Sequence, residues 1–301
     1  MAADTQFPWT EPHQKNLESE RRISKNLIKN YFYSMSKLAS KIHVDLKAIF
    51  INGDLTAFGH DHELSTFREL LQIPKSWTQV HLGLGNHDYA NNVDDCFENQ
   101  CSTRMVKYMM EQKALYSNMD VEVTHFPPAN EEDWYTVVYR GSLAYSLDIG
   151  GIHIVQLHNY PTYANQWNST NYLEDILEVF QINDSLEWLK RDLDDASNKN
   201  RSIIICMHDP ILPRRFQNLI IKYKISAIFV GHYHSNIGLY DRNTESDDIV
   251  PVFGSGSAIY GTYLLVKFEN QNRMQISAWN AKNGDVQKIA LQNLEEDFQL
   301  G

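Results

Sequence analysis

The segment Lys47-Ala-Ile-Phe-Ile-Asn-Gly-Asp54 places a short apolar run directly before a glycine and a carboxylate. A run of this length, rich in β-branched and aromatic residues, predicts a buried strand. A helical pattern around Glu63–Leu71 follows it, and then a second apolar run, Val80-His-Leu-Gly-Leu84. This β–α–β order predicts a parallel sheet with helices on its faces.

The alternation of helices and strands continues on both sides of this segment. Apolar residues recur at helical spacing from Lys15 to Ile42, and helices are also expected at Asp184–Ala196 and Phe216–Tyr223. Gly150-Gly151 is the expected hairpin turn between two of the later strands. The pattern indicates one α/β domain, residues 1–301, with an antiparallel second half. The later strands are expected at Tyr135–Tyr139, Leu143–Leu147, His153–Leu157, Ser202–Met207, Ala227–Val230, Val250–Phe253, Tyr263–Phe268 and Met274–Trp279.

Residues of about 90–134 interrupt this rhythm. They are mostly polar, contain a helical pattern near Arg104–Ala114 and include the pair Pro127-Pro128 close to their end. Such a composition suits a segment that packs over one end of a sheet. We therefore expect an insertion within the domain rather than a second domain.

The composition excludes several classes of function. The 301-residue chain has a formal net charge of −11 and no cluster of Lys and Arg. A nuclease that grips a long polyanion usually carries a basic stripe, so nucleic acid is not an expected partner. No apolar run approaches the roughly 20 residues of a membrane span, so no transmembrane segment is expected. The oligomeric state stays open.

The cysteines leave two interpretations of the cellular compartment. Cys96 and Cys101 are close enough in sequence to form a disulfide, as in an exported protein, while Cys206 lies alone in an apolar run. The alternative is three reduced thiols in a cytoplasmic protein. The first ten residues lack the basic start and apolar middle of a secretory signal, and they do not decide the compartment. We favour the exported protein and keep the cytoplasmic one as the alternative.

Side chains that bind metals or exchange protons stand directly after several predicted strands. The carboxyl ends of parallel strands meet at one edge of a sheet, where α/β proteins build their sites, so these side chains are expected to lie together. Imidazole, carboxylate and amide oxygen without a thiolate suit zinc, iron or manganese. The segments are Asn52-Gly53-Asp54, Gly85-Asn86-His87-Asp88, His208-Asp209 and Gly231-His232-Tyr233-His234.

The order of these segments resembles the calcineurin-like metallophosphoesterase superfamily, whose pattern is D-x-H, G-D, G-N-H-(D/E), a strand-end H and G-H-x-H. The match runs from Asp4 to His234. The resemblance implies a four-layer αββα sandwich, with mixed central sheets flanked by helices and a metal site at the carboxyl ends of the strands. It also implies two metal ions and hydrolysis of a phosphoric ester by a hydroxide that bridges them.

The resemblance assigns the ligands of a first metal ion. Asp54 would be the carboxylate that bridges both ions, and Asp4 and His234 would bind the first ion. Gln6 stands where the commonest pattern has His. Its amide oxygen is a weaker ligand than imidazole for zinc or iron and is more tolerable for manganese or magnesium. The strand that should precede Asp4 is mostly missing from the sequence, so this half of the centre is expected to be the weaker one.

The resemblance also assigns a second ion and the groups that act on the substrate. Asn86, through its amide oxygen, would bind the second ion together with His208 and His232. His87 would contact the phosphate and protonate the leaving oxygen. Asp88 is expected to orient His87 by accepting its other N–H, as outer carboxylates do.

Several other polar residues have two readings. His158 and Asn159 follow the apolar run 152–157, and they either contact the substrate or form a turn that satisfies its own backbone. His60 and His62 are expected at a helix start rather than on a metal. The remaining histidines are expected to be ordinary core or surface residues, namely His13, His43, His81, His125 and His153.

The sequence therefore predicts a hydrolase of a small-molecule or lipid phosphoester. Asp rather than Glu in Gly85-Asn86-His87-Asp88 is similar to several diesterase branches of the superfamily, which favours phosphodiesters. A phosphomonoesterase of the same fold is the first alternative. A catalytically weak module that binds metal or a partner is the second, and Gln6 motivates it.

Overall fold

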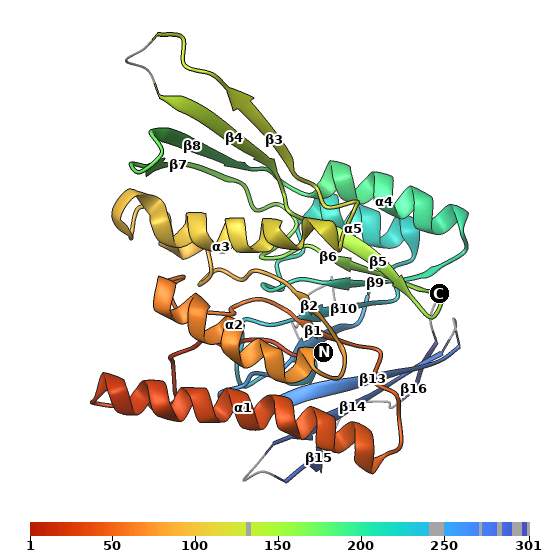
Figure 1. Ribbon diagram of the computed structural model, residues 1–301. Coiled ribbons are helices and arrows are strands. Elements are labelled where there is room, and N and C mark those ends of the chain that lie inside the picture. Colours follow the sequence, from red (N-terminus) through yellow and green to blue (C-terminus); the bar gives the residue numbers. More distant parts are fainter. Residues whose placement is uncertain (131–133, 241–249, 271–272, 282–284, 291–296, 300–301) are drawn as a thin grey trace.

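The first β–α–β unit forms as the sequence predicts. The computed structural model describes residues 1–130, 134–240, 250–270, 273–281, 285–290 and 297–299. Strand β1 (Ala48–Ile51) pairs in parallel with β2 (Gln79–Leu82), and helix α2 (Asp61–Lys75) joins them. Helix α1 (Leu17–Lys41) lies beside α2 on the same side of these strands (Figure 1). Asn16 starts α1 because its side chain accepts hydrogen bonds from the backbone N–H groups of residues 18 and 19.

The first residues of the chain complete the first sheet. Ala2 lies parallel to β1, with its N–H on the Phe50 carbonyl and its carbonyl on the Asn52 N–H, each at 2.8 Å. On its other side, Met1 exchanges backbone hydrogen bonds with Leu264 of β13 (Thr262–Asn270). This short extended segment therefore joins β1 to the sheet of β13, and it delivers Asp4 to the carboxyl end of β1.

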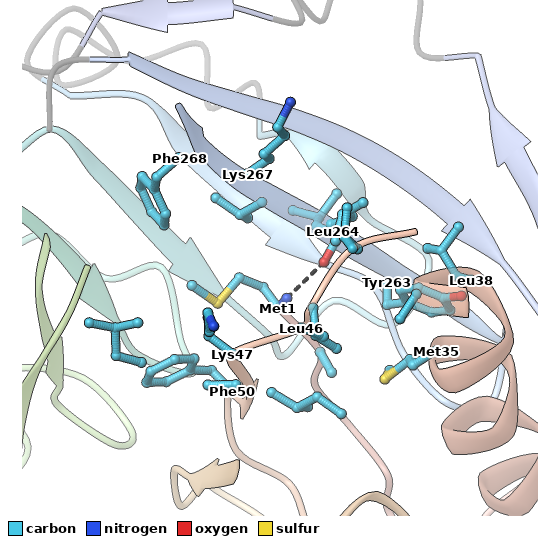
Figure 2. Close-up of a pocket in the computed structure, with 18 of the residues that line it drawn as sticks. Met1, Met35, Leu38, Leu46, Lys47, Phe50, Tyr263, Leu264, Lys267 and Phe268 are labelled. Atoms are coloured by element: carbon cyan, nitrogen blue, oxygen red, sulfur yellow. Dashed lines mark hydrogen bonds between the residues drawn. The ribbon is translucent and has the colours of Figure 1, made fainter. Parts of the chain in front are cut away.

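An apolar cavity of about 430 Å³ lies beside this segment. Figure 2 shows Met1 at its centre, with side chains of α1, β1 and β13 around it, among them Met35, Phe50 and Phe268. The sheet extends beyond β13: β14 (Arg273–Asn280) pairs with β13, and β15 (Gln287–Ile289) and β16 (Asp297–Gln299) pair with β14.

The second sheet has the strand order β11-β12-β10-β9-β6-β5. Its central strands β6, β9, β10 and β12 run parallel, and its outer strands β5 and β11 run antiparallel to their neighbours. The turn at Gly150-Gly151 joins β5 to β6, as predicted, and both glycines have positive φ. The strands are β5 (Tyr145–Ile149), β6 (Ile152–Gln156), β9 (Ser202–Cys206), β10 (Ala227–Val230), β11 (Ile237–Leu239) and β12 (Val252–Ser255).

The buried side chains of these strands alternate between neighbouring layers. On β1, Ile49 and Ile51 pack toward α1 and α2, whereas Phe50 packs between the two sheets. On β9, Ile204 packs between the sheets, whereas Ile205 packs toward α4 (Leu186–Asn198) and α5 (Arg214–Tyr223). The result is the order helices, sheet, sheet, helices (Figure 1), which confirms the expected four-layer αββα fold.

A further four-stranded sheet was not expected from the sequence. It has the order β3-β4-β8-β7 and projects from one end of the molecule above α3 (Gln100–Met110) (Figure 1). Its strands are β3 (Glu122–Phe126), β4 (Tyr135–Gly141), β7 (Asn165–Asn171) and β8 (Ile176–Ile182). Strand β7, with the sequence NQWNSTN, is too polar to be recognised as a strand. Stacking of its Trp167 on Phe180, with ring centroids 5.3 Å apart, supplies the packing.

The expected insertion at about 90–134 contains α3 and β3, while the partners of β3 lie later in the chain. Residues 131–133 of that range are outside the described residues, and the division into a single domain 1–301 stays a prediction.

Cys96 and Cys101 form a disulfide at the start of α3, so the bridged alternative holds, and Cys206 is a buried free thiol. Within the described ranges, no helix combines the length and apolar character needed to cross a membrane.

His153 of β6 lies between the carboxylates of Asp148 on β5 and Asp192 on α4, and the stability that these contacts contribute depends on pH. The His153 ring lies 2.8 Å from Asp148 and 2.9 Å from Asp192, and its side chain is 10% exposed. Burial acts to lower the pKa of His153, but the two carboxylates outweigh it and raise the pKa. Because the unfolded value is about 6.5, the stabilisation is fully present below about pH 6.5 and is lost as the pH rises through the folded pKa.

We therefore expect the variant His153→Asn to lose more unfolding free energy at pH 5 than at pH 9. Urea denaturation at both pH values, in the presence of a chelator, measures the difference. His125→Asn, at an exposed position of β3, is the matched control and should change little at either pH. An equal loss at pH 5 and pH 9 would contradict the assignment.

Candidate metal centre

The predicted strand-end residues meet where the edges of the two sheets approach each other. Asp54 and Asn86 follow β1 and β2 of the first sheet, and His208 and His232 follow β9 and β10 of the second. The His208 Nδ1–H donates to the Asn52 carbonyl at 2.8 Å, which ties the two sheets together at this point.

Two glycines permit this close approach. A Cβ at Gly53 would lie 2.5 Å from the His208 ring, and Gly53 also has a φ of +85°. A Cβ at Gly85 would lie 2.1 Å from the Asp54 carboxylate. Glycine is therefore needed at both positions because side chains of the site occupy the space beside them.

The residues predicted to hold a second metal ion converge closely. The Nε2 atom of His208 lies 3.2 Å from Asp54 Oδ2 and 2.9 Å from Asn86 Oδ1. The Nδ1 atom of His232 lies 3.1 Å from the same Asn86 oxygen. Ligand atoms that each stand about 2 Å from one ion are separated by about 3 Å. The arrangement therefore fits a single cation with carboxylate, amide and imidazole ligands.

The residues predicted to hold a first metal ion form a looser group beside Asp54. His234 Nε2 lies 3.8 Å from Asp4 Oδ1, and Gln6 donates from its amide nitrogen to Asp54 Oδ2 at 3.0 Å. The oxygens Asp4 Oδ2 and Gln6 Oε1 are buried and have no hydrogen-bond partner among the described residues. Ligand atoms of Asp4, Asp54 and His208 also lie within 4.8 Å of one another. Unsatisfied buried oxygens beside a carboxylate pair fit a second cation.

The electrostatics of the site also favour cations. Asp4, Asp54 and Asp88 are buried carboxylates, and burial raises the pKa of Asp4 and raises that of Asp88 to about 7. Burial acts to lower the pKa of His208, but Asp54 raises it to about 10, and His208 in turn lowers the pKa of Asp54. The His208 imidazole therefore faces two buried carboxylates, those of Asp54 and Asp4. Divalent cations would supply the missing positive charge, with His208 binding in its neutral form.

His87 stands at the rim of this group and is partly exposed. Its backbone N–H donates to Asp54 Oδ1 at 2.9 Å, and its ring Nδ1 lies 3.1 Å from the Ala57 carbonyl oxygen. Because a carbonyl only accepts, Nδ1 carries the proton. The ring of Trp9 packs edge-on against His87, with centroids 4.8 Å apart. Neither Ala57 nor Trp9 belongs to a motif that could have identified it from the sequence.

The expected role of Asp88 in orienting His87 is wrong. Its carboxylate accepts hydrogen bonds from the N–H groups of Leu55, Thr56 and Gly85, at 2.9–3.0 Å, and from the Thr56 hydroxyl. These contacts join the turn after β1 to the turn after β2. Asp88 is therefore a buried clamp that positions the turns carrying Asp54 and Asn86, and the Ala57 carbonyl holds His87 instead.

The expected substrate contact of His158 is also wrong. Its ring is fully buried, with Nδ1 accepting from the Leu84 N–H at 3.0 Å and Nε2 donating to the Leu143 carbonyl at 2.8 Å. Burial lowers the pKa of His158 to about 4, so it is neutral near pH 7. The neighbouring Asn159 is 2% exposed, and its carbonyl accepts hydrogen bonds from the N–H groups of His208 and Asp209. Both residues support the site from beneath, as in the alternative reading of a structural turn.

A pocket of about 240 Å³ lies against His232 and His234. Glu11 and Tyr260 line it, and the Tyr260 hydroxyl donates to the Glu11 carboxylate. This hydrogen bond is the largest cause that lowers the pKa of Glu11, and His234 adds to it. Sequence reasoning missed both residues, because Tyr260 is far from His234 in the chain and belongs to no motif.

The remaining histidines behave as expected. His60 begins α2, and its N–H and ring Nδ1 both bond to the buried Glu63 carboxylate, which is the predicted helix start. His81 is buried on β2 against the Tyr116 hydroxyl, and burial lowers its pKa to about 4.

Comparison with known proteins gives a family and a fold. Residues 7–236 match the family model of the calcineurin-like phosphoesterases. A solved structure of a purple acid phosphatase from yellow lupin (Lupinus luteus) seeds is similar to this chain, with a TM-score of 0.52 and 13% identity. The match covers 88% of this chain but 48% of the lupin chain, so the chain spans about half the length of that relative. None of the curated proteins compared with the chain matches it.

The clamp formed by Asp88 predicts a stability effect that is separate from metal binding. Asp88→Asn places an amide nitrogen against backbone donors, and we expect the free energy of unfolding in a chelator to fall by about 2–4 kcal/mol. Urea denaturation of the metal-free protein measures this. Asp95→Asn, which removes an exposed carboxylate from the same stretch of chain, should be neutral. Equal stability of the two variants would argue against the clamp.

Proposed function

The chain belongs to the calcineurin-like phosphoesterase family, and from that premise we propose that it is a metal-dependent hydrolase of phosphoric esters. The observation that carries the proposal is the convergence of Asp54, Asn86, His208 and His232, whose ligand atoms lie about 3 Å apart at the meeting point of two sheets. These side chains come from the strand ends of two separate sheets, and a shared cation explains why their ligand atoms meet at one point.

We propose two metal ions, with manganese, iron or zinc as the candidates. Asp4, Gln6 and His234 would hold the first, Asn86, His208 and His232 the second, and Asp54 both. When bound, such a pair activates water as the nucleophile and stabilises charge on the phosphoryl oxygens. The buried oxygens of Asp4 and Gln6, which have no hydrogen-bond partner in the described part of the chain, support the first site. The tight grouping around Asn86 Oδ1 supports the second.

We propose His87 as the residue that binds a phosphate oxygen and protonates the leaving alcohol. The Ala57 carbonyl accepts from its Nδ1–H and the Trp9 ring makes an edge-on contact with it, so the imidazole is held at the rim of the site while it stays partly exposed. A proton on Nε2 can then pass to the leaving oxygen.

We propose a phosphodiester, including a lipid phosphoester, as the preferred substrate. The pocket beside His234 presents the Glu11 carboxylate and the Tyr233 and Tyr260 rings, and none of its lining residues, all of them described, is a lysine or arginine. A phosphomonoester carries close to two negative charges at neutral pH and would face Glu11, whereas a diester carries one and offers an organic substituent to the aromatic rings. A phosphomonoesterase remains the alternative. The Cys96–Cys101 disulfide favours an oxidising, exported setting for the enzyme.

Turnover after metal loading tests this proposal. Chelator-treated protein reconstituted with Mn²⁺, Zn²⁺ or Fe²⁺ should hydrolyse bis-p-nitrophenyl phosphate faster than p-nitrophenyl phosphate. His87→Ala should lower kcat by about 10²–10⁴-fold, the usual range for loss of a general acid, and should leave metal content unchanged. Asp54→Asn should lower both metal content and activity.

His62→Ala, at an exposed position of α2 outside the site, is the matched control for removal of an imidazole. Full activity in both His87→Ala and Asp54→Asn would exclude this site. A metal-loaded protein that hydrolyses neither ester would favour the binding module suggested by Gln6.

A further inference from the structure

His234 is held between two carboxylates. Its Nε2 atom lies 3.8 Å from Asp4 Oδ1 and its Nδ1 atom lies 3.2 Å from Glu11 Oε1, and the side chain is 16% exposed. A carboxylate only accepts, so the short contact to Glu11 places a proton on Nδ1. In the neutral ring, Nε2 then keeps the lone pair that a metal ion needs, and Nε2 is the atom that faces Asp4. A separation of 3.8 Å is too long for a hydrogen bond but is close to that of two ligands of one ion.

Glu11 is itself held in place by a distant part of the chain. The Tyr260 hydroxyl donates to the Glu11 carboxylate, and the Tyr260 carbonyl accepts from the Asn280 side chain at 3.2 Å. In the same segment, the Ser257 hydroxyl donates to the His234 carbonyl at 3.0 Å. The stretch 257–260, between β12 and β13, therefore braces both Glu11 and His234. It lies beyond residues 7–236, which match the family model.

This contact bears on the weakest point of the proposed centre. Gln6 offers a neutral amide oxygen, which binds zinc and iron less strongly than an imidazole does. A carboxylate that accepts the second N–H of a metal-binding histidine fixes its tautomer and raises its basicity as a ligand. Glu11 stands in that position toward His234.

We propose that Glu11 is a positioning residue for the first metal site, acting through His234 and offsetting the weak ligand Gln6, with Tyr260 holding Glu11 in place. This inference rests on the proposed function in that it needs a metal ion at Asp4 and His234. It requires no particular substrate and no turnover.

The rival explanation is that Glu11 adds only negative charge near the site. Asp209 offers a control, because its negative charge acts on His232, another proposed ligand, through space. The Glu11 carboxylate, in contrast, directly contacts His234. Asp209→Asn and Glu11→Gln each remove one negative charge, but only the second changes a hydrogen-bond partner of His234.

Titration of the metal-free full chain with Mn²⁺, followed by calorimetry and by electron paramagnetic resonance, tests the proposal. The binding step that His234→Ala removes defines the first site. We expect Glu11→Gln and Glu11→Ala to weaken that step by about 10–100-fold and to leave the other step unchanged. Tyr260→Phe should weaken it less, and Asp209→Asn by about threefold or less, since a charge without direct contact is screened.

A double-mutant cycle separates this role from a merely structural one. If Glu11 offsets Gln6, then Glu11→Gln should cost less affinity when Gln6→His is also present, because the site then has a stronger ligand. Thermal unfolding in a chelator checks that each variant is folded.

The proposal would be overturned if Glu11→Ala and Asp209→Asn weakened Mn²⁺ binding at the first site equally. It would also be overturned if that binding were unchanged in both Glu11→Ala and Tyr260→Phe. A protein that shows the Glu11-dependent step but hydrolyses no ester would contradict the proposed function and uphold this inference. Ester hydrolysis together with metal binding at the first site that does not depend on Glu11 would support the proposed function and contradict this inference.

Discussion

The hydrogen bond from His208 Nδ1 to the Asn52 carbonyl, 2.8 Å long, joins the carboxyl ends of two sheets that pack their apolar faces against each other. It fixes the His208 ring so that Nε2 faces Asp54 and Asn86, which belong to the other sheet. Because a Cβ at position 53 would overlap the His208 ring, the approach is possible only with Gly53. The candidate metal centre is therefore a property of the interface between the sheets and of neither sheet alone.

The cost of burying charge shapes the rest of the site. Three buried carboxylates lie close together, and an isolated buried charge is unfavourable by several kcal/mol. The fold handles them differently. Both oxygens of Asp88 accept hydrogen bonds, and Asp54 has His208 and the backbone N–H of His87 as partners. Among the described residues, one oxygen of Asp4 has no hydrogen-bond partner. The number of hydrogen bonds therefore distinguishes Asp88, which has a structural role, from Asp4 and Asp54, which we propose as metal ligands.

Two segments outside the central motifs shape the mouth of the site. The stretch that follows Gln6 brings Trp9 against His87 and Glu11 against His234, and residues 257–260 support it from the other side. The result is an acidic and aromatic rim around a site that attracts cations. Such a rim disfavours a second negative charge on a substrate, and this is the basis on which we propose a diester rather than a monoester as the substrate. Both segments lie at the rim of the candidate centre, and we propose that they influence which ester it accepts.

The sequence by itself determined the local patterns. Short apolar runs with strand-end glycines predicted β1, β2, β9 and β10, helical spacing predicted α1, and the residues after the strands predicted the ligand groups. These features depend on neighbours along the chain, so periodicity and turn chemistry reveal them.

Only the tertiary structure decided which partners these residues have. Asp88 hydrogen-bonds the backbone of two turns, and His87 hydrogen-bonds the Ala57 carbonyl. His158 hydrogen-bonds two buried backbone groups, and Glu11 contacts His234 and Tyr260. The tertiary structure also formed β7 from a polar segment, because stacking of Trp167 on Phe180 outweighs its weak local preference. Each of these contacts joins residues that are distant in the chain or satisfies a buried group in one of several equally good ways. The sequence pattern does not show which partner each group will have, because the packing of the sheets determines it.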